Sequence, residues 1–262
     1  MDRFPALFIS HGSPMLAIED SPARRFLAGY GEALGRPRAI VIVSAHWETR
    51  GPAVSAAPRP ETIHDFAGFP DALHRLGYPA AGAPNLAERI AGLMRDAGAP
   101  VTVHPTRGLD HGAWVPLMLL YPAHDVPVLQ VSVQTQAGPE WHLRLGGILR
   151  PLRDEGVLIV GSGAMTHNLH AFFRGGYGPD SPAPDWVTRF ADWMAEAIGA
   201  DRRDDLLAYR ARAPHGAENH PTEEHLLPLF AALGAATPGG ARSRVHASNS
   251  HGVLAMDAYA FA

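Results

Sequence analysis

The residues of this 262-residue sequence that are best suited to catalysis or metal binding are its fifteen histidines. The chain has no cysteine, and its 22 basic residues are all arginine, so thiolate metal sites and lysine Schiff-base chemistry are excluded. Three histidines follow apolar runs: His11 in "LFISHG", His46 in "VIVSAHW" and His167 in "LIVGSGAMTH". Because ligands of open α/β sheets collect beyond the carboxyl ends of the strands, we expect these three imidazoles to meet at one site.

A second group of polar residues, "HPTEEH", stands at the start of the last predicted helix, and His111 in "GLDHGAW" enters an apolar helix-like segment. Adjacent residues on a helix point about 100° apart, so Glu224 and His225 cannot easily both bind one metal directly. Neutral imidazole suits iron, zinc or nickel, and three protein ligands leave positions open for other molecules. The strand-end histidines and this cluster together predict a metal site.

Other polar and aromatic residues have less defined roles. Trp47 and Glu48 follow His46 directly. We interpret Trp47 as part of the wall of the site and Glu48 as a residue that supports the metal ligands without touching the metal. Four aromatic residues could stack on an aromatic ring, although core packing is the favoured role for each: Trp47, Phe66, Phe69 and Trp114. We interpret eight further histidines as solvated or hydrogen-bonded side chains: His74, His104, His124, His142, His170, His215, His246 and His251.

Strand-like apolar runs alternate with helix-like segments along the chain. Most of the runs are continuous, which is typical of strands buried on both faces beneath helices; they are Ala6–Ile9, Ala39–Val43, Val101–His104, Val126–Val133 and Val157–Val160. The helix-like segments are Ser21–Gly31, Ala83–Ala97, Glu140–Glu155, Pro184–Ile198 and Thr222–Leu233. We expect Pro228 to kink or split the last segment. The pattern predicts one α/β domain over residues 1–262, with a central, largely parallel or mixed sheet flanked by helices.

Charge and hydropathy narrow the range of partners. The formal net charge is −4 and no basic cluster is visible, so nucleic-acid binding has little support. The sequence has no run of about 18 apolar residues, and we therefore expect no membrane-spanning helix. The start of the chain, "MDRFPALFISHG", lacks the apolar core of a signal peptide, which favours a cytoplasmic location.

Seven motifs between residues 7 and 236 resemble, in order, those of the DODA-type extradiol aromatic ring-opening dioxygenases. These enzymes belong to the class III extradiol superfamily, which includes the catalytic subunit of protocatechuate 4,5-dioxygenase. The motifs are "LFISHGSPM", "IVIVSAHWETRG", "TIHDFAGFPDALHRLGYPAAGAP", "GLDHGAWVPLMLLYP", "PVLQVSVQ", "LIVGSGAMTHNL" and "HPTEEHLLPLFAALGAA". The resemblance covers nearly the whole chain and is more specific for the family than for its substrate.

The resemblance implies roles for five histidines. It makes His11, His46 and His225 metal ligands. It makes His167 the acid–base residue near the open face of the metal, close enough in some members to count as a fourth ligand. His111 would line the pocket and contact the substrate or dioxygen.

The resemblance leaves some assignments open. Glu224 remains a rival of His225, because the third ligand in the wider superfamily is a carboxylate. His64 and Asp65 match a pocket-facing family segment. The metal expected for activity is Fe(II), although members are also found with zinc. The partners implied are dioxygen and a small catechol-type substrate, DOPA-like or related, with the chain as a monomer or homo-oligomer.

The chemistry that the resemblance implies is opening of an aromatic ring beside its two hydroxyl groups. A catechol binds a divalent metal through two adjacent oxygens, and a histidine near neutral pKa can accept one proton and later return it. Two alternatives use the same residues. A zinc-dependent hydrolase would need the same ligands and acid–base histidine, and a non-catalytic metal-binding relative would share the fold.

Overall fold

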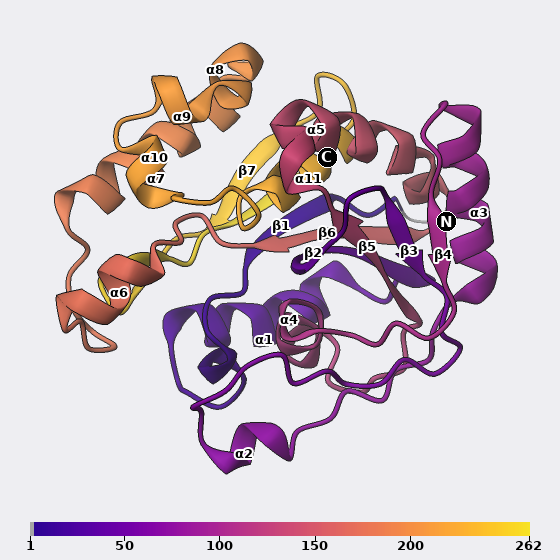
Figure 1. Cartoon of the computed structure of the whole chain (residues 1–262), viewed down its shortest axis with the longest axis horizontal. Coiled ribbons are helices and arrows are strands. Elements are labelled where there is room, and N and C mark those ends of the chain that lie inside the picture. Colours follow the sequence, from indigo (N-terminus) through magenta and orange to yellow (C-terminus); the bar gives the residue numbers. More distant parts are fainter. Residues whose placement is uncertain (1–2) are drawn as a thin grey trace.

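A computed structural model describes residues 3–262, and its centre is an eight-stranded mixed sheet (Figure 1). The order of the strands across the sheet is β4-β3-β5-β2-β6-β1-β10-β7. The bounds of these strands are β1 Ala6–Ser10, β2 Ala39–Glu48, β3 Ala53–Ser55, β4 Thr102–His104, β5 Val128–Val133, β6 Val157–Gly163, β7 Arg242–His246 and β10 Ala258–Phe261.

The four central strands run parallel and form the most buried part of the sheet. β1 pairs with β6, β6 with β2 and β2 with β5, all in parallel, and every residue of β1, β5 and β6 is buried. Antiparallel pairs lie toward the edges, where β10 joins β1, β7 joins β10 and β3 joins β5. The predicted fold class, an α/β fold with a mixed sheet flanked by helices, is confirmed.

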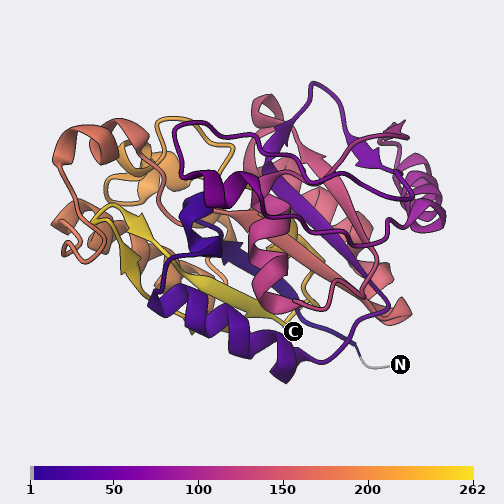
Figure 2. The same ribbon diagram turned by 90° about the horizontal axis from the view of Figure 1, so that it is seen from below.

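Two layers of helices cover each face of the sheet (Figures 1 and 2). On one face, α11 (Leu227–Ala235) lies against β6 and β1, and α5 (Gly138–Leu149) packs on its outer side. On the other face, α4 (His111–Leu120) lies against β2, and α1 (Pro22–Leu34) covers α4. Gly146 permits the close approach of α5 to α11, because a Cβ there would overlap the carbonyl oxygen of Ala231.

The remaining elements surround this core. The other helices are α2 Asp71–His74, α3 Pro84–Asp96, α6 Leu169–Gly175, α7 Asp185–Gly199, α8 Arg203–Leu207, α9 Tyr209–Arg212 and α10 Gly216–Asn219. Three short 3₁₀ segments are η1 Pro14–Ala17, η2 Thr135–Ala137 and η3 Arg150–Glu155, and a small separate pair of strands is formed by β8 Asn249–Ser250 and β9 Leu254–Ala255. Within residues 3–262, no helix has the length and apolar character needed to cross a membrane.

The elements differ from the sequence prediction in several places. The predicted helix Glu140–Glu155 is α-helical only to Leu149, in α5, and continues as the 3₁₀ segment η3. The last long helix begins at Leu227 instead of Thr222, so Pro228 lies in its first turn, where a missing N–H costs nothing, and it neither kinks nor splits the helix. Strands β3, β7, β8, β9 and β10 were not predicted. β7 begins at Arg242, inside a segment that its proline and glycine residues would assign to a surface loop.

Candidate metal centre

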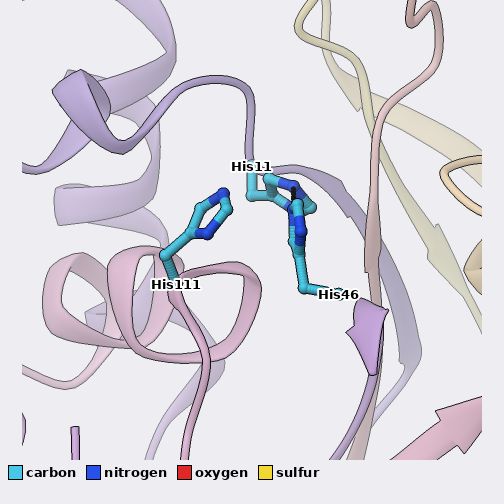
Figure 3. A group of neighbouring side chains, drawn as sticks. All are labelled: His11, His46 and His111. Carbon is cyan, nitrogen blue, oxygen red and sulfur yellow. Dashed lines mark hydrogen bonds between the residues drawn. The ribbon is translucent and has the colours of Figure 1, made fainter. Parts of the chain in front are cut away.

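His11 and His46 reach one point from strands β1 and β2, which flank β6 in the sheet. His11 directly follows β1, as predicted. His46 lies within β2 and not after it, in a stretch where the pairing with β5 shifts register between Val43 and Glu48. Because an irregularity of this kind bends a strand and redirects its side chains, the imidazole of His46 turns toward that of His11 (Figure 3).

His111 reaches the same point from the first residue of α4. Asp110 caps this helix, and its Oδ1 also accepts a hydrogen bond of 2.6 Å from the hydroxyl of Ser44 on β2. Gly112 allows the close approach: a Cβ there would lie 2.6 Å from Ser44 Oγ and 2.9 Å from Cδ2 of His46. The start of α4 is therefore held against the end of β2, and the ring of His111 lies 3.9 Å from that of His46 between centroids (Figure 3).

His225 and His167 complete the cluster from two segments beyond the sheet. His225 precedes α11 by two residues, and its carbonyl accepts a hydrogen bond of 2.8 Å from the backbone N–H of Ala164, just after β6. Gly163 makes this contact possible, because a Cβ there would overlap that carbonyl oxygen. The rings of His167 and His225 stack with centroids 3.4 Å apart and planes inclined by 11°.

The Nε2 atoms of three histidines converge. Nε2 of His46 lies 3.0 Å from Nε2 of His11 and 3.3 Å from Nε2 of His225. Two nitrogen ligands held about 2.0–2.1 Å from one ion, at angles between 90° and tetrahedral, lie roughly 2.8–3.4 Å apart. The donor set and its spacing therefore fit a divalent metal ion.

The outer nitrogen atoms of two of these rings are already occupied. Nδ1 of His11 lies 3.0 Å from Oγ of Ser162, whose own hydroxyl donates to the carbonyl of Gly112. The hydroxyl oxygen therefore accepts from His11, which places the ring proton on Nδ1. Nδ1 of His225 lies 2.9 Å from Oε1 of Glu224. Partners of this kind fix the ring and leave Nε2 free for a metal, which is the usual arrangement around metal-bound histidine.

Asp65 contacts the rings of His46 and His111. Its Oδ1 accepts a hydrogen bond of 2.9 Å from the backbone N–H of His111 and lies 3.0 Å from Nδ1 of the same residue. Its Oδ2 lies 3.7 Å from Nδ1 of His46. Burial alone would raise the pKa of Asp65, but the hydrogen bonds and charge of His111 lower this pKa to about 2. Asp65 is therefore a carboxylate at neutral pH.

Burial keeps four imidazoles of the cluster uncharged, those of His11, His46, His167 and His225. Desolvation is the largest cause in each case and the neighbouring rings add to it, although nearby carboxylates oppose the shift at His46 and His167. The pKa of His46 falls to about 3 and that of His167 to about 4. The pKa values of His11 and His225 also lie well below 6.5. Metals bind the neutral ring, so these four imidazoles are in the form that binds a metal at neutral pH.

A cavity of about 530 Å³ opens above the histidines. His46, His111, His167 and His225 contribute to its lining, and so do the aromatic side chains of Phe66, Phe69, Phe172 and Phe173. This volume lies in the range of pockets that enclose small molecules. The structure thus places a small-molecule pocket directly over the candidate metal ligands.

The predicted aromatic residues divide into two groups. Phe66 and Phe69 line the cavity, whereas Trp114 is fully buried in the core and donates from Nε1 to the carbonyl of Ile63. Trp47 is also a core residue, with the guanidinium of Arg107 over its ring. Neither tryptophan lines the cavity.

Other polar predictions also lie outside the lining, and Asp65, whose contacts are given above, is one of them. Glu48 is exposed, and its carboxylate accepts a hydrogen bond from Thr135, away from the histidines. His64 lies 3.0 Å through Nε2 from the carbonyl of Leu76. The sequence-based prediction missed Glu19, Phe172, Phe173 and His251 in the lining. The one available signal was the apolar "AFF" of α6, in which Phe172 is half-buried and Phe173 is exposed.

Buried imidazoles gathered at strand ends beneath a cavity of this size are the arrangement of a metal-dependent enzyme that acts on a small molecule. Residues 5–261 match the family described as the catalytic LigB subunit of aromatic ring-opening dioxygenase. The chain belongs to this family. Membership confirms the predicted family and the expected class of enzyme, a ring-cleaving dioxygenase.

Similar proteins extend over nearly the whole chain. The 4,5-DOPA dioxygenase extradiol of Beta vulgaris is 43% identical over 260 residues, which cover 97% of this chain and 95% of the relative. The protein of the same name from Escherichia coli (strain K12) is 43% identical over 237 residues, covering 89% and 85%. A crystal structure of an uncharacterized protein from Escherichia coli K12 matches with a TM-score of 0.82 at 36% identity, covering 99% of this chain and 100% of that one.

Proposed function

We propose that residues 1–262 act as one catalytic domain that opens the ring of a catechol beside its diol, using dioxygen. The observation that carries this proposal is the convergence of three Nε2 atoms, 3.0 and 3.3 Å apart, at the base of an aromatic-walled cavity. The names of the relatives make DOPA the first candidate substrate.

His11, His46 and His225 would hold the metal, which we propose to be Fe(II). Glu224 would act through its hydrogen bond to Nδ1 of His225 instead of binding the ion. When bound, iron would supply Lewis acidity toward the catechol hydroxyls and a redox route between catechol and dioxygen. Three neutral imidazoles without a directly bound carboxylate leave most of the charge of the ion for the catecholate to balance.

His167 and His111 would handle protons and position the substrate. His167 lines the cavity, and burial lowers its pKa to about 4, so its ring is unprotonated at neutral pH and keeps a nitrogen lone pair for a catechol proton. A proton received there would be stabilised by Glu224, whose charge raises the pKa of His167. His111, held by Asp65, would present its other ring nitrogen to the substrate or dioxygen.

The test is reconstitution of the metal-free protein under anaerobic conditions with Fe(II) or with Zn(II), followed by addition of air and a catechol such as DOPA. We expect oxygen uptake and the yellow absorbance of a ring-fission product with iron, and neither with zinc. Stoichiometric metal binding without oxygen uptake on any catechol would contradict the proposal and favour the zinc hydrolase or the non-catalytic relative.

A further inference from the structure

The wall of the cavity has only one sign of fixed charge. Apart from histidines, Glu19 is the single ionisable residue among the described residues that line it. No described arginine contributes to the lining, and the chain contains no lysine. Helix α6 contributes Phe172 and Phe173 to the lining. The arginine that follows them, Arg174, is exposed and does not line the cavity.

The carboxylate of Glu19 has no partner among residues 3–262. Its backbone N–H donates to the carbonyl of Met15 at 2.7 Å, just beyond η1, but its side chain makes no hydrogen bond or ion pair with a described residue. The two arginines nearby in sequence are engaged elsewhere: Arg24 donates to carbonyls of η1 and Arg25 pairs with Asp20. A partly buried carboxylate without a partner is available to a cation that enters the cavity.

The apolar walls favour the same kind of ligand. Phe66, Phe69, Phe172 and Phe173 present aromatic rings, whose faces attract ammonium groups. A carboxylate in the same place would lose its water and meet Glu19 without a guanidinium to balance it. Apart from Glu19 and the histidines at the base of the cavity, the polar side chains of the lining are Ser13 and His251. Oγ of Ser13 accepts a hydrogen bond of 3.3 Å from the backbone N–H of Met15, and Nδ1 of His251 lies 2.8 Å from Oγ of Ser250.

We propose that Glu19 selects catechols whose side chain ends in an ammonium group and carries no carboxylate. The diol would face the histidines and the ammonium group would reach Glu19 across the aromatic walls. This inference rests on the proposed function, since it concerns the same cavity. It makes an amine-bearing catechol a better substrate than DOPA, whose carboxylate would enter with the amine.

The test compares catechols of similar shape and different charge on the iron-loaded protein. Dopamine carries an ammonium group, 4-ethylcatechol no charge and dihydrocaffeic acid a carboxylate, and DOPA carries both charges. We expect kcat/KM to fall in the order dopamine, 4-ethylcatechol, dihydrocaffeic acid, and kcat/KM for DOPA to be lower than that for dopamine. The value for dopamine should exceed that for 4-ethylcatechol by about fivefold, as for a partly exposed ion pair. The preference should appear mainly in KM and weaken at high salt.

Glu19→Gln tests the residue itself. We expect it to lower the ratio of kcat/KM for dopamine over 4-ethylcatechol by about fivefold. Glu32→Gln, which removes an equal charge from an exposed position on α1, is the matched control and should keep the parental ratio.

The outcomes separate the two proposals. If no catechol is cleaved, the proposed function fails. If catechols are cleaved but the parent prefers dihydrocaffeic acid or DOPA over dopamine, or cleaves all at equal rates, the role of Glu19 is wrong although the function stands. If the parent prefers dihydrocaffeic acid and His251→Ala abolishes that preference, then His251 and not Glu19 selects the charge of the substrate. The substrate order and its salt dependence decide the matter even if Glu19→Gln does not fold.

Discussion

At the scale of single residues, the candidate centre separates groups that would hold a metal from a group that would move protons. His11 and His225 each direct Nε2 inward and engage Nδ1 with an oxygen. His167 is different, because its ring stacks flat on that of His225, and its ligand nitrogen lies within 4.8 Å of those of His225 and Glu224 without a hydrogen bond to either. This geometry favours His167 as a proton carrier over a fourth ligand.

Replacement of each residue should distinguish the two roles. We expect His167→Ala to bind one metal per chain, as the parent does, and to lose about 10²–10⁴-fold in turnover, the usual contribution of a general acid–base residue. His225→Ala should lose the metal as well as the activity. Metal analysis after dialysis, with rates measured at saturating Fe(II), checks both variants. The proposed role of His167 is wrong if ring cleavage in His167→Ala equals that of the parent, or if this variant loses its metal.

At the scale of elements, the site depends on helices packed closely enough to hold His225 in place. α11 starts two residues after His225 and lies between the sheet and α5. The contact between α5 and α11 is made through a glycine of α5, Gly146, which lies against the carbonyl of Ala231. Gly147, the next residue, has no atom closer to its missing Cβ than the carbonyl oxygen of Gly234 at 4.0 Å.

These neighbouring glycines give a matched pair of substitutions. Gly146→Ala should destabilise the fold by about 2–3 kcal/mol, because the added methyl group must push α5 away from α11. Gly147→Ala should stabilise it by about 0.5–1 kcal/mol, since the methyl group has space and alanine favours helix. Urea denaturation of both variants measures the difference. Equal stabilities would show that the packing of α5 on α11 adapts freely.

The sequence predicted the elements that bury apolar runs and missed those that depend on distant partners. The parallel strands that precede His11 and His167 are continuous apolar runs, so the ends of these strands and the places of these two histidines could be predicted directly. β10 is a short segment, Ala258–Phe261, which is a strand because it pairs antiparallel with β1 at the other end of the chain. The residues next to β10 in the sequence do not indicate this pairing.

The same limit applies to the pocket. His225 was recognised, but its segment was placed in a helix, although the backbone from Pro221 to Leu226 is irregular and is held by contacts such as that between Ala164 and the carbonyl of His225. Glu19 and Phe173 reach the cavity from segments more than 150 residues apart. Their meeting is a consequence of tertiary packing, and neither residue type nor spacing indicates it.

At the scale of the whole molecule, burial of neutral histidines links stability to pH. Desolvation by burial lowers the pKa of His142 from 6.5 to about 4, that of His167 to about 4 and those of His46 and His220 to about 3. Between pH 6.5 and 4, the unfolded chain therefore binds protons that the folded chain does not. The free energy of unfolding must rise with pH over this window and fall as the solution is acidified through it.

His142 allows this linkage to be measured away from the candidate metal ligands. Its ring bridges the carbonyl of Gly138, 2.7 Å from Nδ1, and the backbone N–H of Gln134, 3.2 Å from Nε2. A glutamine amide can donate to the first and accept from the second without titrating, so His142→Gln should flatten the loss of stability of the metal-free protein between pH 6.5 and 4. A shift from 6.5 to about 4 corresponds to on the order of 3 kcal/mol.

Urea denaturation of the metal-free protein at pH 4.5, 5.5, 6.5 and 7.5 (about one unit apart across the linkage window) gives the slope for parent and variant. His170→Gln, at an exposed position, serves as the control. We expect the slope of His142→Gln to be smaller than that of the parent and of His170→Gln. Parallel curves for all three proteins would mean that His142 takes up its proton in the folded state as readily as in the unfolded chain, and that burial of this ring does not contribute to acid sensitivity.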